Sequence, residues 1–260
     1  MKPANNEPVV QPPFAQELAR HWEGFVGCTA RSSTMAPFLI RSLRLNRSSR
    51  VMDLAAGTGC DMVSLHDRGI PACGNEINAG LRCVAQEAFR RRGWNPGLYE
   101  CDWCELTRVF QPGAFDAAFI VGNSLCLLGE ERARSIAARE MRAILRRGGR
   151  LVVDERNFEY MLRSRNEILS GEFNYRRRVV YCGDEVHGRP VAIADDEVVF
   201  SYVHRRTGQE IGRLSMYAFK HHELRDLFER SGFRRVEVLG DLGASNTENA
   251  DFIAHVFEAK

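Results

Sequence analysis

The chain has 260 residues, of which 44% are hydrophobic and 27% are charged, enough apolar material for a sizeable core and too much for a disordered or fibrous protein. Its 36 Lys and Arg nearly balance its 34 Asp and Glu, so no excess of positive charge indicates a nucleic-acid or membrane-surface protein. We therefore expect neither nucleic acid nor membrane as a partner.

Residues 1–13 are rich in Pro and Asn and predict a mobile N-terminal arm. They lack the pattern of a signal peptide, and no stretch approaches the ~20 apolar residues that span a bilayer. The eight cysteines are scattered among apolar residues, which favours reduced thiols and a cytoplasmic location. No metal site is predicted, because the CxxC pair at 101–104 has no second pair of ligands.

Short β-branched runs alternate with helical stretches as far as residue 154, which predicts an α/β domain with a mostly parallel sheet. The expected helices lie at 16–45 (broken near Gly27), 61–68, 79–92 and 130–145. The expected strands lie at 50–54, 72–76, 98–101, 115–121 and 150–154, with a turn at 147–149.

The pattern changes between about residues 160 and 218, where alternating residues predict antiparallel strands with one wet face. These strands are expected at 175–181, 191–193, 197–204 and 210–217. The block is too short to fold alone and indicates a β-rich lid. A helix at 222–231 and strands at 235–239 and 251–258 follow. We expect one domain over 14–260, with a helical cap at 14–48.

The most informative segment follows the first buried strand. Residues 51–61 read VMDLAAGTGCD, a strand and a loop with Gly57 and Gly59 that opens a helix. Ligands of open α/β sheets bind at such strand ends. The third glycine of a dinucleotide motif is missing, and Asp53 and Asp61 would repel a pyrophosphate. These acids suit a cofactor with a positive centre and an amino-acid tail.

The next two expected strands also end in side chains that suit a nucleoside. Glu76 follows Gly59 by 17 residues, and a carboxylate there can accept both hydroxyls of a ribose. Asp102 can accept an adenine amino group, while Trp103 offers a flat apolar face. Each alone could be an exposed acid or a core tryptophan, but three consecutive strand ends favour a nucleoside site.

The order of these elements resembles the class I S-adenosylmethionine-dependent methyltransferases, and more narrowly the glycine and sarcosine N-methyltransferase group. The narrower resemblance rests on GNS at 122–124, DERNFEY at 154–160, LSMY at 214–217 and LGD at 239–241, and extends from about Trp22 to the C-terminus. It implies a Rossmann-like methyltransferase sheet, mostly parallel with an antiparallel last strand. It also implies S-adenosylmethionine as the cofactor and S-adenosylhomocysteine as its product.

The resemblance assigns cofactor contacts by position. Trp22 and Arg31 would close over the cofactor, with Arg31 reaching its carboxylate, and Val121 would place a backbone group near the sulfonium. The full expected set is Trp22, Arg31, Ala56, Gly57, Glu76, Asp102, Trp103 and Val121.

The resemblance also implies an acceptor site in which Asn123 and Arg156 orient the acceptor as the catalytic residues. An arginine just after a strand end can bind a carboxylate through two parallel hydrogen bonds. The alternative for Arg156 is a surface salt bridge with a neighbouring acid.

Three aromatic residues complete the expected substrate-binding set. Phe25 stands near a position where the group carries tyrosine, which indicates a more apolar pocket and a bulkier or more apolar acceptor than glycine. Tyr202 and Tyr217 are expected contacts whose alternative is a structural place in the inserted strands.

The expected function is methyl transfer to a small-molecule acceptor, the amine of an amino acid or a related carboxylate-bearing amine. None of the seven histidines is a convincing general base, which favours N-methylation over an O- or C-methyltransferase of natural-product type. Residues 122–125 lack the [DN]PPY motif of base-amine methyltransferases. A cofactor-binding protein without turnover is a further alternative, and an arm that crosses to a neighbouring subunit would imply a homo-oligomer.

Overall fold

The computed structural model of the protein describes residues 14–171, 181 and 183–260. The expected N-terminal arm at 1–13, almost all of the expected strand at 175–181, and Cys182 lie outside the described residues.

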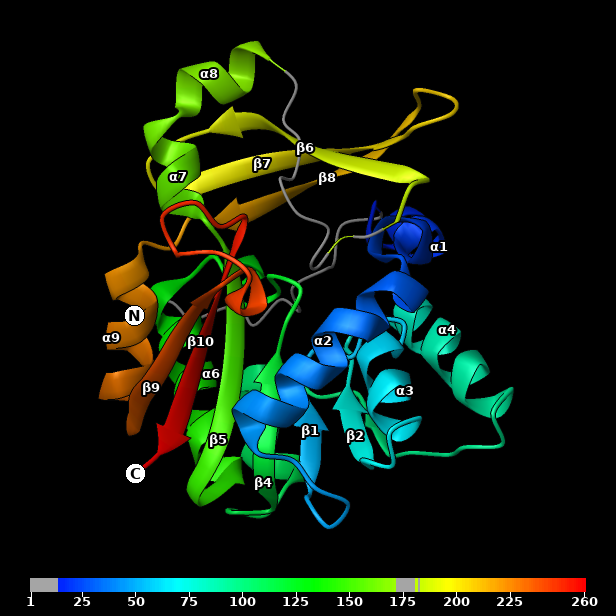
Figure 1. Cartoon of the computed structure of the whole chain (residues 1–260), viewed down its shortest axis with the longest axis vertical. Coiled ribbons are helices and arrows are strands. Elements are labelled where there is room, and N and C mark those ends of the chain that lie inside the picture. The colour runs from blue at the N-terminus through cyan, green and yellow to red at the C-terminus, as the bar shows by residue number, and fades with distance from the viewer. Residues whose placement is uncertain (1–13, 172–180, 182) are drawn as a thin grey trace, which may run out of the picture.

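A seven-stranded sheet with the order β3-β2-β1-β4-β5-β10-β9 forms the centre of the molecule (Figure 1). Its strands are β1 (Val51–Asp53), β2 (Ala72–Asn75), β3 (Leu98–Tyr99), β4 (Phe115–Ile120), β5 (Leu145–Arg156), β9 (Phe233–Gly240) and β10 (Phe252–Ala259). The first five pair in parallel, whereas β10 runs antiparallel to both β5 and β9. The expected mostly parallel sheet with an antiparallel last strand is confirmed.

Helices cover both faces of the sheet, with α2 in front of it and α6 behind it in Figure 1. This double cover explains why β1 and β4 are almost continuous apolar runs rather than alternating ones. The helices are α1 (Phe14–Val26), α2 (Cys28–Leu43), α3 (Cys60–His66), α4 (Ala79–Arg90), α5 (Leu106–Val109), α6 (Glu131–Ile144), α7 (Phe158–Arg163), α8 (Arg165–Ser170) and α9 (His221–Arg230). None of those among the described residues is long and apolar enough to cross a membrane.

The strand β5 is longer than its sequence pattern indicates. The turn expected at 147–149 lies inside β5, where Gly148 adopts a φ of 74° and the pairing with β4 shifts register. The helices α7 and α8 were not predicted either. Asn157 begins α7 by accepting the Tyr160 N–H at 3.1 Å, so the chain that leaves β5 enters helices before it reaches the lid.

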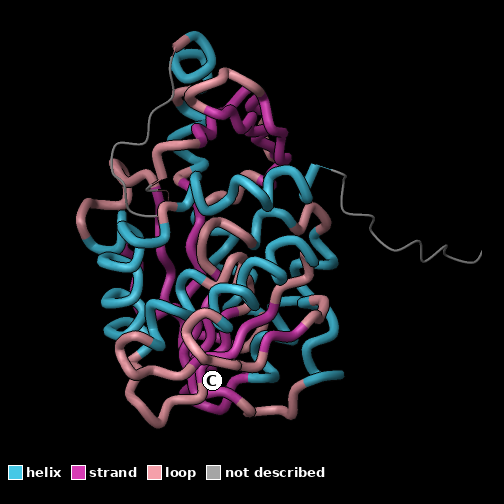
Figure 2. The backbone as a smooth tube through the Cα atoms, turned by 90° about the vertical axis from the view of Figure 1, so that its right-hand side faces the viewer, coloured by secondary structure: helices cyan, strands magenta, loops and turns pink. Residues whose placement is uncertain are grey.

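A separate antiparallel sheet of β6 (Val186–Ile193), β7 (Glu197–His204) and β8 (Glu210–Tyr217) lies at one end of the molecule (Figure 2). This confirms the inserted antiparallel lid. Backbone bonds from Gly183 to Phe25 and from Glu185 to Gly24 join the chain entering the lid to α1. We therefore keep a single domain over residues 14–260 as our proposal.

Candidate active site

The strand order has its switch point at the carboxyl ends of β1 and β4, and we call the place between the loops that follow these two strands the crevice. The strands β2 and β3 lie on one side of β1, whereas β4 and β5 lie on its other side. The loops after β1 and β4 therefore lead away from each other, and ligands of open α/β sheets bind at such a point. The expected cofactor loop at 54–59 and the expected acceptor loop at 121–124 both lie there.

Glu76 holds the glycine loop from the neighbouring strand. Its carboxylate, 9% exposed, accepts the Gly57 N–H at 2.8 Å and the Asn78 N–H at 2.7 Å. Burial raises the pKa of Glu76, although these backbone bonds oppose the rise. Gly59 adopts a φ of 78°, and a Cβ there would approach the Phe89 ring to 2.6 Å. The loop therefore requires glycine at position 59. The Glu76 carboxylate lies against Gly57, as a nucleoside site needs.

Asn75 ties three strand ends together, which was not predicted. Its Nδ2 donates to the Cys101 carbonyl at 2.9 Å, and its Oδ1 accepts the Cys101 N–H at 2.9 Å. Trp103 joins the same edge, because its Nε1 donates to the Leu54 carbonyl at 2.6 Å. Asp102 is exposed beside it, with Oδ1 accepting a backbone N–H two residues later. An amide at a strand end was the available sequence signal for Asn75.

The cap helices cover the glycine loop. Trp22 of α1 places its Nε1 3.9 Å from the position of a Cβ on Gly57. Arg31 of α2 is buried and binds Asp61 through Nε at 3.0 Å and Nη2 at 2.7 Å. Although burial lowers the pKa of Arg31, this ion pair outweighs it and raises the pKa. The guanidinium that we expected on the cofactor carboxylate thus fastens α2 to α3.

Buried acids lie around the crevice, and their charge favours a cationic ligand there. Burial raises the pKa of Asp53 well above its ordinary value, and the neighbouring Asp61 adds to the shift. Burial also raises the pKa of Asp154, against the N–H groups of Gly122 and Asn123. A cationic ligand would relieve these costs, since opposite charge favours the ionised carboxylate. These buried carboxylates therefore fit a sulfonium cofactor with an amino-acid tail.

Asn123 is held in an uncommon backbone conformation, with a φ of 63°. Asp154 accepts the Asn123 N–H at 2.7 Å, and the side-chain Oδ1 of Asn123 accepts the Arg156 N–H at 2.8 Å. Its Nδ2 donates to the sulfur atoms of Cys126 and Met216. Val121, just before this turn, is buried. The side chain that we expected on the acceptor thus joins the loop after β4 to the end of β5.

Arg156 is fully buried, and aromatic rings surround its guanidinium. The guanidinium carbon lies 4.1 Å from the centre of the Phe200 ring, 4.8 Å from that of Tyr181 and 5.2 Å from that of Phe252. Such rings attract a cation and fix the plane of the guanidinium. The surface salt bridge considered as an alternative is excluded, because Arg156 has no exposed surface.

The expected contacts Phe25 and Tyr202 lie in the same aromatic cluster. Their ring centres are 5.0 Å apart, and Trp22 lies 5.3 Å from Phe25 and 6.3 Å from Tyr202. Burial raises the pKa of the Tyr202 hydroxyl to about 12, against the lowering effect of Arg156. The cluster links the helical cap to Arg156.

Tyr181 was missed by the sequence analysis. Its ring stacks on Phe25 at 4.2 Å, and its hydroxyl donates to the Gly122 carbonyl at 2.6 Å. It therefore connects the cap to the loop after β4. We find no sequence signal for this role, whereas Phe200 follows from the alternation of β7, in which Val198, Phe200 and Tyr202 are all buried.

Tyr217 does not join the cluster. Met216 faces Asn123, and successive side chains of a strand point to opposite faces. The Tyr217 ring lies 3.7 Å below the Arg134 guanidinium, and its hydroxyl donates to Glu223. The structure thus places it against α6 and α9, in line with the structural alternative.

The expectation that all cysteines are reduced is wrong for one pair. Cys28 at the start of α2 and Cys60 at the start of α3 form a disulfide. Sequence separation hid this pairing, which depends on how the cap packs against the glycine loop. Five others are free thiols, namely Cys73, Cys83, Cys101, Cys104 and Cys126. Among the described residues, no cluster of metal-ligating side chains occurs.

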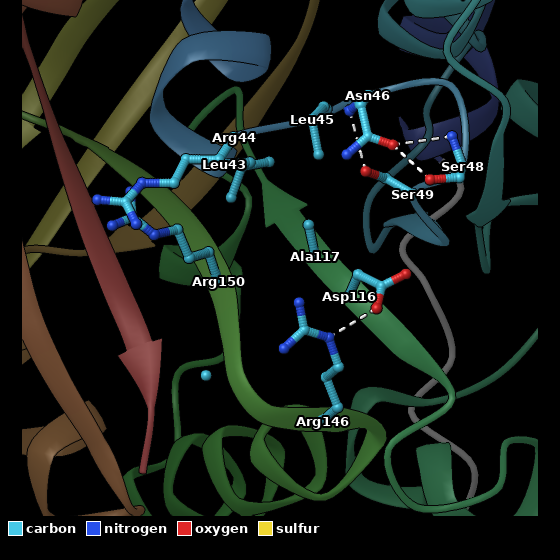
Figure 3. A pocket seen from close by; sticks show the side chains of 11 residues that line it. Leu43, Arg44, Leu45, Asn46, Ser48, Ser49, Asp116, Ala117, Arg146 and Arg150 are labelled. Atoms are coloured by element: carbon cyan, nitrogen blue, oxygen red, sulfur yellow. Dashed lines mark hydrogen bonds and ion pairs between the residues drawn. The ribbon is translucent and has the colours of Figure 1, made fainter.

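A cavity of about 380 Å³ lies at the opposite edge of the sheet (Figure 3). The turn after α2 and the amino ends of β4 and β5 line it, with Arg44 and Arg150 on one side. Arg146 is paired with Asp116 at 2.7 Å, and Arg150 lies 3.8 Å from Glu258. The cavity is separate from the crevice and contains none of the expected site residues.

A buried acid behind Arg156 links the site to the pH dependence of stability. Glu155 Oε1 lies 3.0 Å from His255 Nε2 and 3.3 Å from His221 Nδ1. Burial lowers the pKa of His221, but Glu155 outweighs this and raises it. Burial likewise raises the pKa of Glu155, yet the two histidines outweigh it and lower that pKa.

We expect the free energy of unfolding to fall as the pH rises above the ordinary histidine value of 6.5, through the raised pKa of His221. The protonated histidine stabilises the folded state below 6.5, and this contribution is lost on deprotonation. Likewise, Glu155 contributes above 4.5 and loses this contribution as the pH falls through its lowered pKa. Glu155→Gln should flatten both pH-dependent slopes of the free energy of unfolding, measured by urea denaturation at a series of pH values. His66→Gln, at a histidine that stacks on Trp94, should leave both slopes unchanged. An unchanged profile in Glu155→Gln would contradict the assignment.

Comparison with known proteins finds methyltransferases similar to this chain. Residues 51–149 match the family described as "Methyltransferase domain". The chain is 28% identical over 248 residues to a glycine/sarcosine N-methyltransferase from Parasynechococcus marenigrum, covering 95% of this chain and 85% of that protein. It is 31% identical to mouse glycine N-methyltransferase over 157 residues, which cover 56% of this chain and 54% of the mouse protein.

Solved structures share the fold. An S-adenosylmethionine-dependent methyltransferase from Clostridium acetobutylicum superposes with a TM-score of 0.71 at 17% identity, covering 94% of this chain and 98% of that one. The CcbJ methyltransferase from Streptomyces caelestis gives 0.67 at 16% identity, covering 95% and 97%. The chain is therefore an enzyme, an S-adenosylmethionine-dependent methyltransferase, and it resembles the class I group of these enzymes and within it the glycine/sarcosine N-methyltransferases.

Proposed function

We propose that this enzyme methylates the amine of a small carboxylate-bearing acceptor, an amino acid or a close relative. The observation that carries the proposal is Arg156, a fully buried guanidinium at the end of β5 beside the loop after β4. A guanidinium can bind an acceptor carboxylate through two parallel hydrogen bonds. The relatives that the chain resembles include glycine/sarcosine N-methyltransferases, which supports an amino-acid acceptor.

The cofactor is proposed to occupy the crevice after β1 and to supply a methyl group activated by the sulfonium. Glu76 would accept the ribose hydroxyls, and Ala56 with Gly57 would lie against the methionine portion. Asp102 and Trp103 would bind the adenine. Val121 completes this set from the loop after β4.

Trp22 and Arg31 act from above this crevice. Trp22 would exclude water from the loop because its indole lies over Gly57. Arg31 holds the cap in place through Asp61 and adds positive charge on the side where the cofactor's carboxylate would lie.

Arg156 orients the acceptor, and Asn123 positions Arg156. The hydrogen bond from the Arg156 N–H to the Asn123 Oδ1 fixes the backbone position of Arg156. The Phe200 ring fixes the plane of its guanidinium. The aromatic faces of Phe25 and Tyr202 would enclose the amine. Such faces favour a methylated or apolar amine, because they offer apolar contact without competing hydrogen bonds.

The attacking nitrogen must be neutral, and we propose no dedicated base. The two histidines nearest β5 are engaged with Glu155, whose position next to Arg156 directs it to the opposite face of the strand. The carboxylate of Asp154 is engaged by the N–H groups of Gly122 and Asn123. The amine would therefore lose its proton to solvent before or during binding. A small acceptor also leaves nucleic acid outside the proposal.

A methyl-transfer screen with labelled S-adenosylmethionine tests this function. The panel should pair each amino acid with its decarboxylated amine, namely glycine with methylamine, sarcosine with dimethylamine and alanine with ethylamine. We expect transfer to at least one amino acid and at least about tenfold less to its partner, since a charged hydrogen bond contributes ~1.5–3 kcal/mol. Phenols serve as O-acceptors in the same panel. Transfer to phenols alone, or equal transfer within each pair, would overturn the proposal.

A further inference from the structure

The disulfide between Cys28 and Cys60 lies at the border of the proposed cofactor crevice. Cys28 is the first residue of α2 and Cys60 the first residue of α3, so the bond joins the cap to the helix that follows the glycine loop. Their Cα atoms are 5.6 Å apart, within the usual span of a disulfide. Both residues are only half-buried, which leaves the pair within reach of a thiol in solution.

The bond reinforces a border that other contacts already define. On one side, Trp22 lies over Gly57, which precedes Cys60 by three residues. On the other, Arg31 binds Asp61 directly after Cys60. Cys28 lies between Trp22 and Arg31 along the cap. The disulfide therefore ties the cap to the loop at the place where cap and loop must part to admit a ligand.

The bond is not needed to hold the fold together. The chain buries a large apolar core that includes residues of α2 and α3, and the ion pair between Arg31 and Asp61 joins these two helices by a contact that does not involve the thiols. Small chains with little core depend on disulfides, whereas in reducing compartments disulfides are usually transient and redox-sensing. A reversible bond fits the cytoplasmic location that the sequence leads us to expect and the five free thiols among the described residues.

We propose that Cys28 and Cys60 form a redox-modification site that controls cofactor exchange. In the dithiol form, α1 and the start of α2 separate from the glycine loop and let the cofactor enter and its product leave. In the disulfide form, the cap stays closed on the loop and exchange slows. This inference rests on the cofactor placement proposed above.

The chemistry balances with a low-molecular-weight disulfide as the oxidant. One thiolate attacks glutathione disulfide, forming a mixed disulfide and releasing one glutathione thiol. The second protein thiol then attacks the mixed disulfide, which forms the Cys28–Cys60 bond and releases the second glutathione. Two protein thiols are thus oxidised while one glutathione disulfide is reduced to two thiols, and dithiothreitol reverses the change.

The test compares product release from the two redox forms of the full chain. Purified protein is equilibrated with glutathione disulfide or with dithiothreitol, and peptide mapping measures the Cys28–Cys60 bond. Dissociation of labelled S-adenosylhomocysteine is then followed by displacement. We expect the oxidised form to release it about tenfold more slowly, a usual size for coupling between two sites. Dithiothreitol should restore the faster rate.

Three variants separate the pair from the other thiols. Cys28→Ser and Cys60→Ser should release the product at the reduced wild-type rate in both buffers. Cys83→Ser removes an exposed thiol on α4 and should keep the full redox response. Equal release rates for mapped oxidised and reduced protein would overturn the inference, as would a pair that stays reduced in excess glutathione disulfide. Misplacement of the cofactor would show differently, as unchanged affinity in a Glu76 variant.

Discussion

Replacing Glu76 with Ala is expected to weaken S-adenosylmethionine binding by about 100-fold or more, because each hydrogen bond to a charged group contributes ~1.5–3 kcal/mol and two ribose hydroxyls lose theirs. The structure adds a second reason for a large effect. The same carboxylate accepts the N–H groups of Gly57 and Asn78, so its loss also releases the glycine loop. Isothermal titration calorimetry measures the affinity directly.

Glu100→Ala provides the matched control for this experiment. Glu100 is an exposed acid just beyond β3, paired with Arg82 at 2.6 Å, and Arg82 also donates to the Glu76 carbonyl. The control thus removes a carboxylate from the same edge without touching the crevice. We expect native affinity in Glu100→Ala and an unchanged circular dichroism spectrum in both variants. Near-native affinity in Glu76→Ala would show that the ribose lies elsewhere.

Replacing Arg156 with Met is expected to raise the KM for an amino-acid acceptor by about tenfold to 100-fold, given ~1.5–3 kcal/mol for a charged hydrogen bond. Methionine keeps most of the apolar contact with Phe200 and Tyr181 but cannot bind a carboxylate. The anchor is formed equally in the ground state and the transition state, so kcat should change little. Steady-state kinetics with saturating cofactor separates the two parameters.

Arg134→Met is the control for loss of a buried arginine. Its guanidinium, on α6, is also buried and lies over an aromatic ring, but that ring is Tyr217, which does not belong to the aromatic cluster around Arg156. Its Nη1 donates to the carbonyls of Leu128 and Gly129, so this variant should lose stability while its KM stays native. A similar rise in KM for both variants would mean that general loosening of the lid, rather than a lost anchor, explains the effect.

Local sequence patterns were sufficient to predict the large sheet and the residues that lie at its carboxyl edge. Buried parallel strands are short apolar runs, and the residue after each one lies at a shared edge regardless of long-range packing. Gly57, Glu76 and Trp103 were therefore predictable, and the structure brings Glu76 against Gly57 and Trp103 onto the end of β1. The small lid sheet followed from alternation in the same way.

Side-chain partners across distant segments were not predictable. Arg31 pairs with Asp61, and Cys28 with Cys60, because the cap packs on α3, and no periodicity records that contact. The position of Tyr217 depends on which face of β8 its side chain occupies. Its neighbour Met216 contacts Asn123, so Tyr217 lies on the opposite face. The stacking of Tyr181 on Phe25 exists only in the folded protein and leaves no local sequence pattern.

The roles of Asn123 and Arg156 show the same division. Their positions after β4 and β5 were predictable, but the hydrogen bond from the Arg156 N–H to Asn123 depends on the turn after β4. That turn holds Asn123 at a φ of 63°, a conformation that asparagine tolerates better than most residues. Its effect is to make Asn123 a positioning residue for Arg156.

The central claim is that Arg156 selects acceptors by their carboxylate. Its most direct test is the ratio of kcat/KM for the best amino acid and for its decarboxylated amine, measured in the wild type and in Arg156→Met. We predict that the wild type prefers the amino acid by at least about tenfold, and that the variant loses most of this preference because its loss of kcat/KM falls on the amino acid alone. The same preference in both proteins would contradict the account.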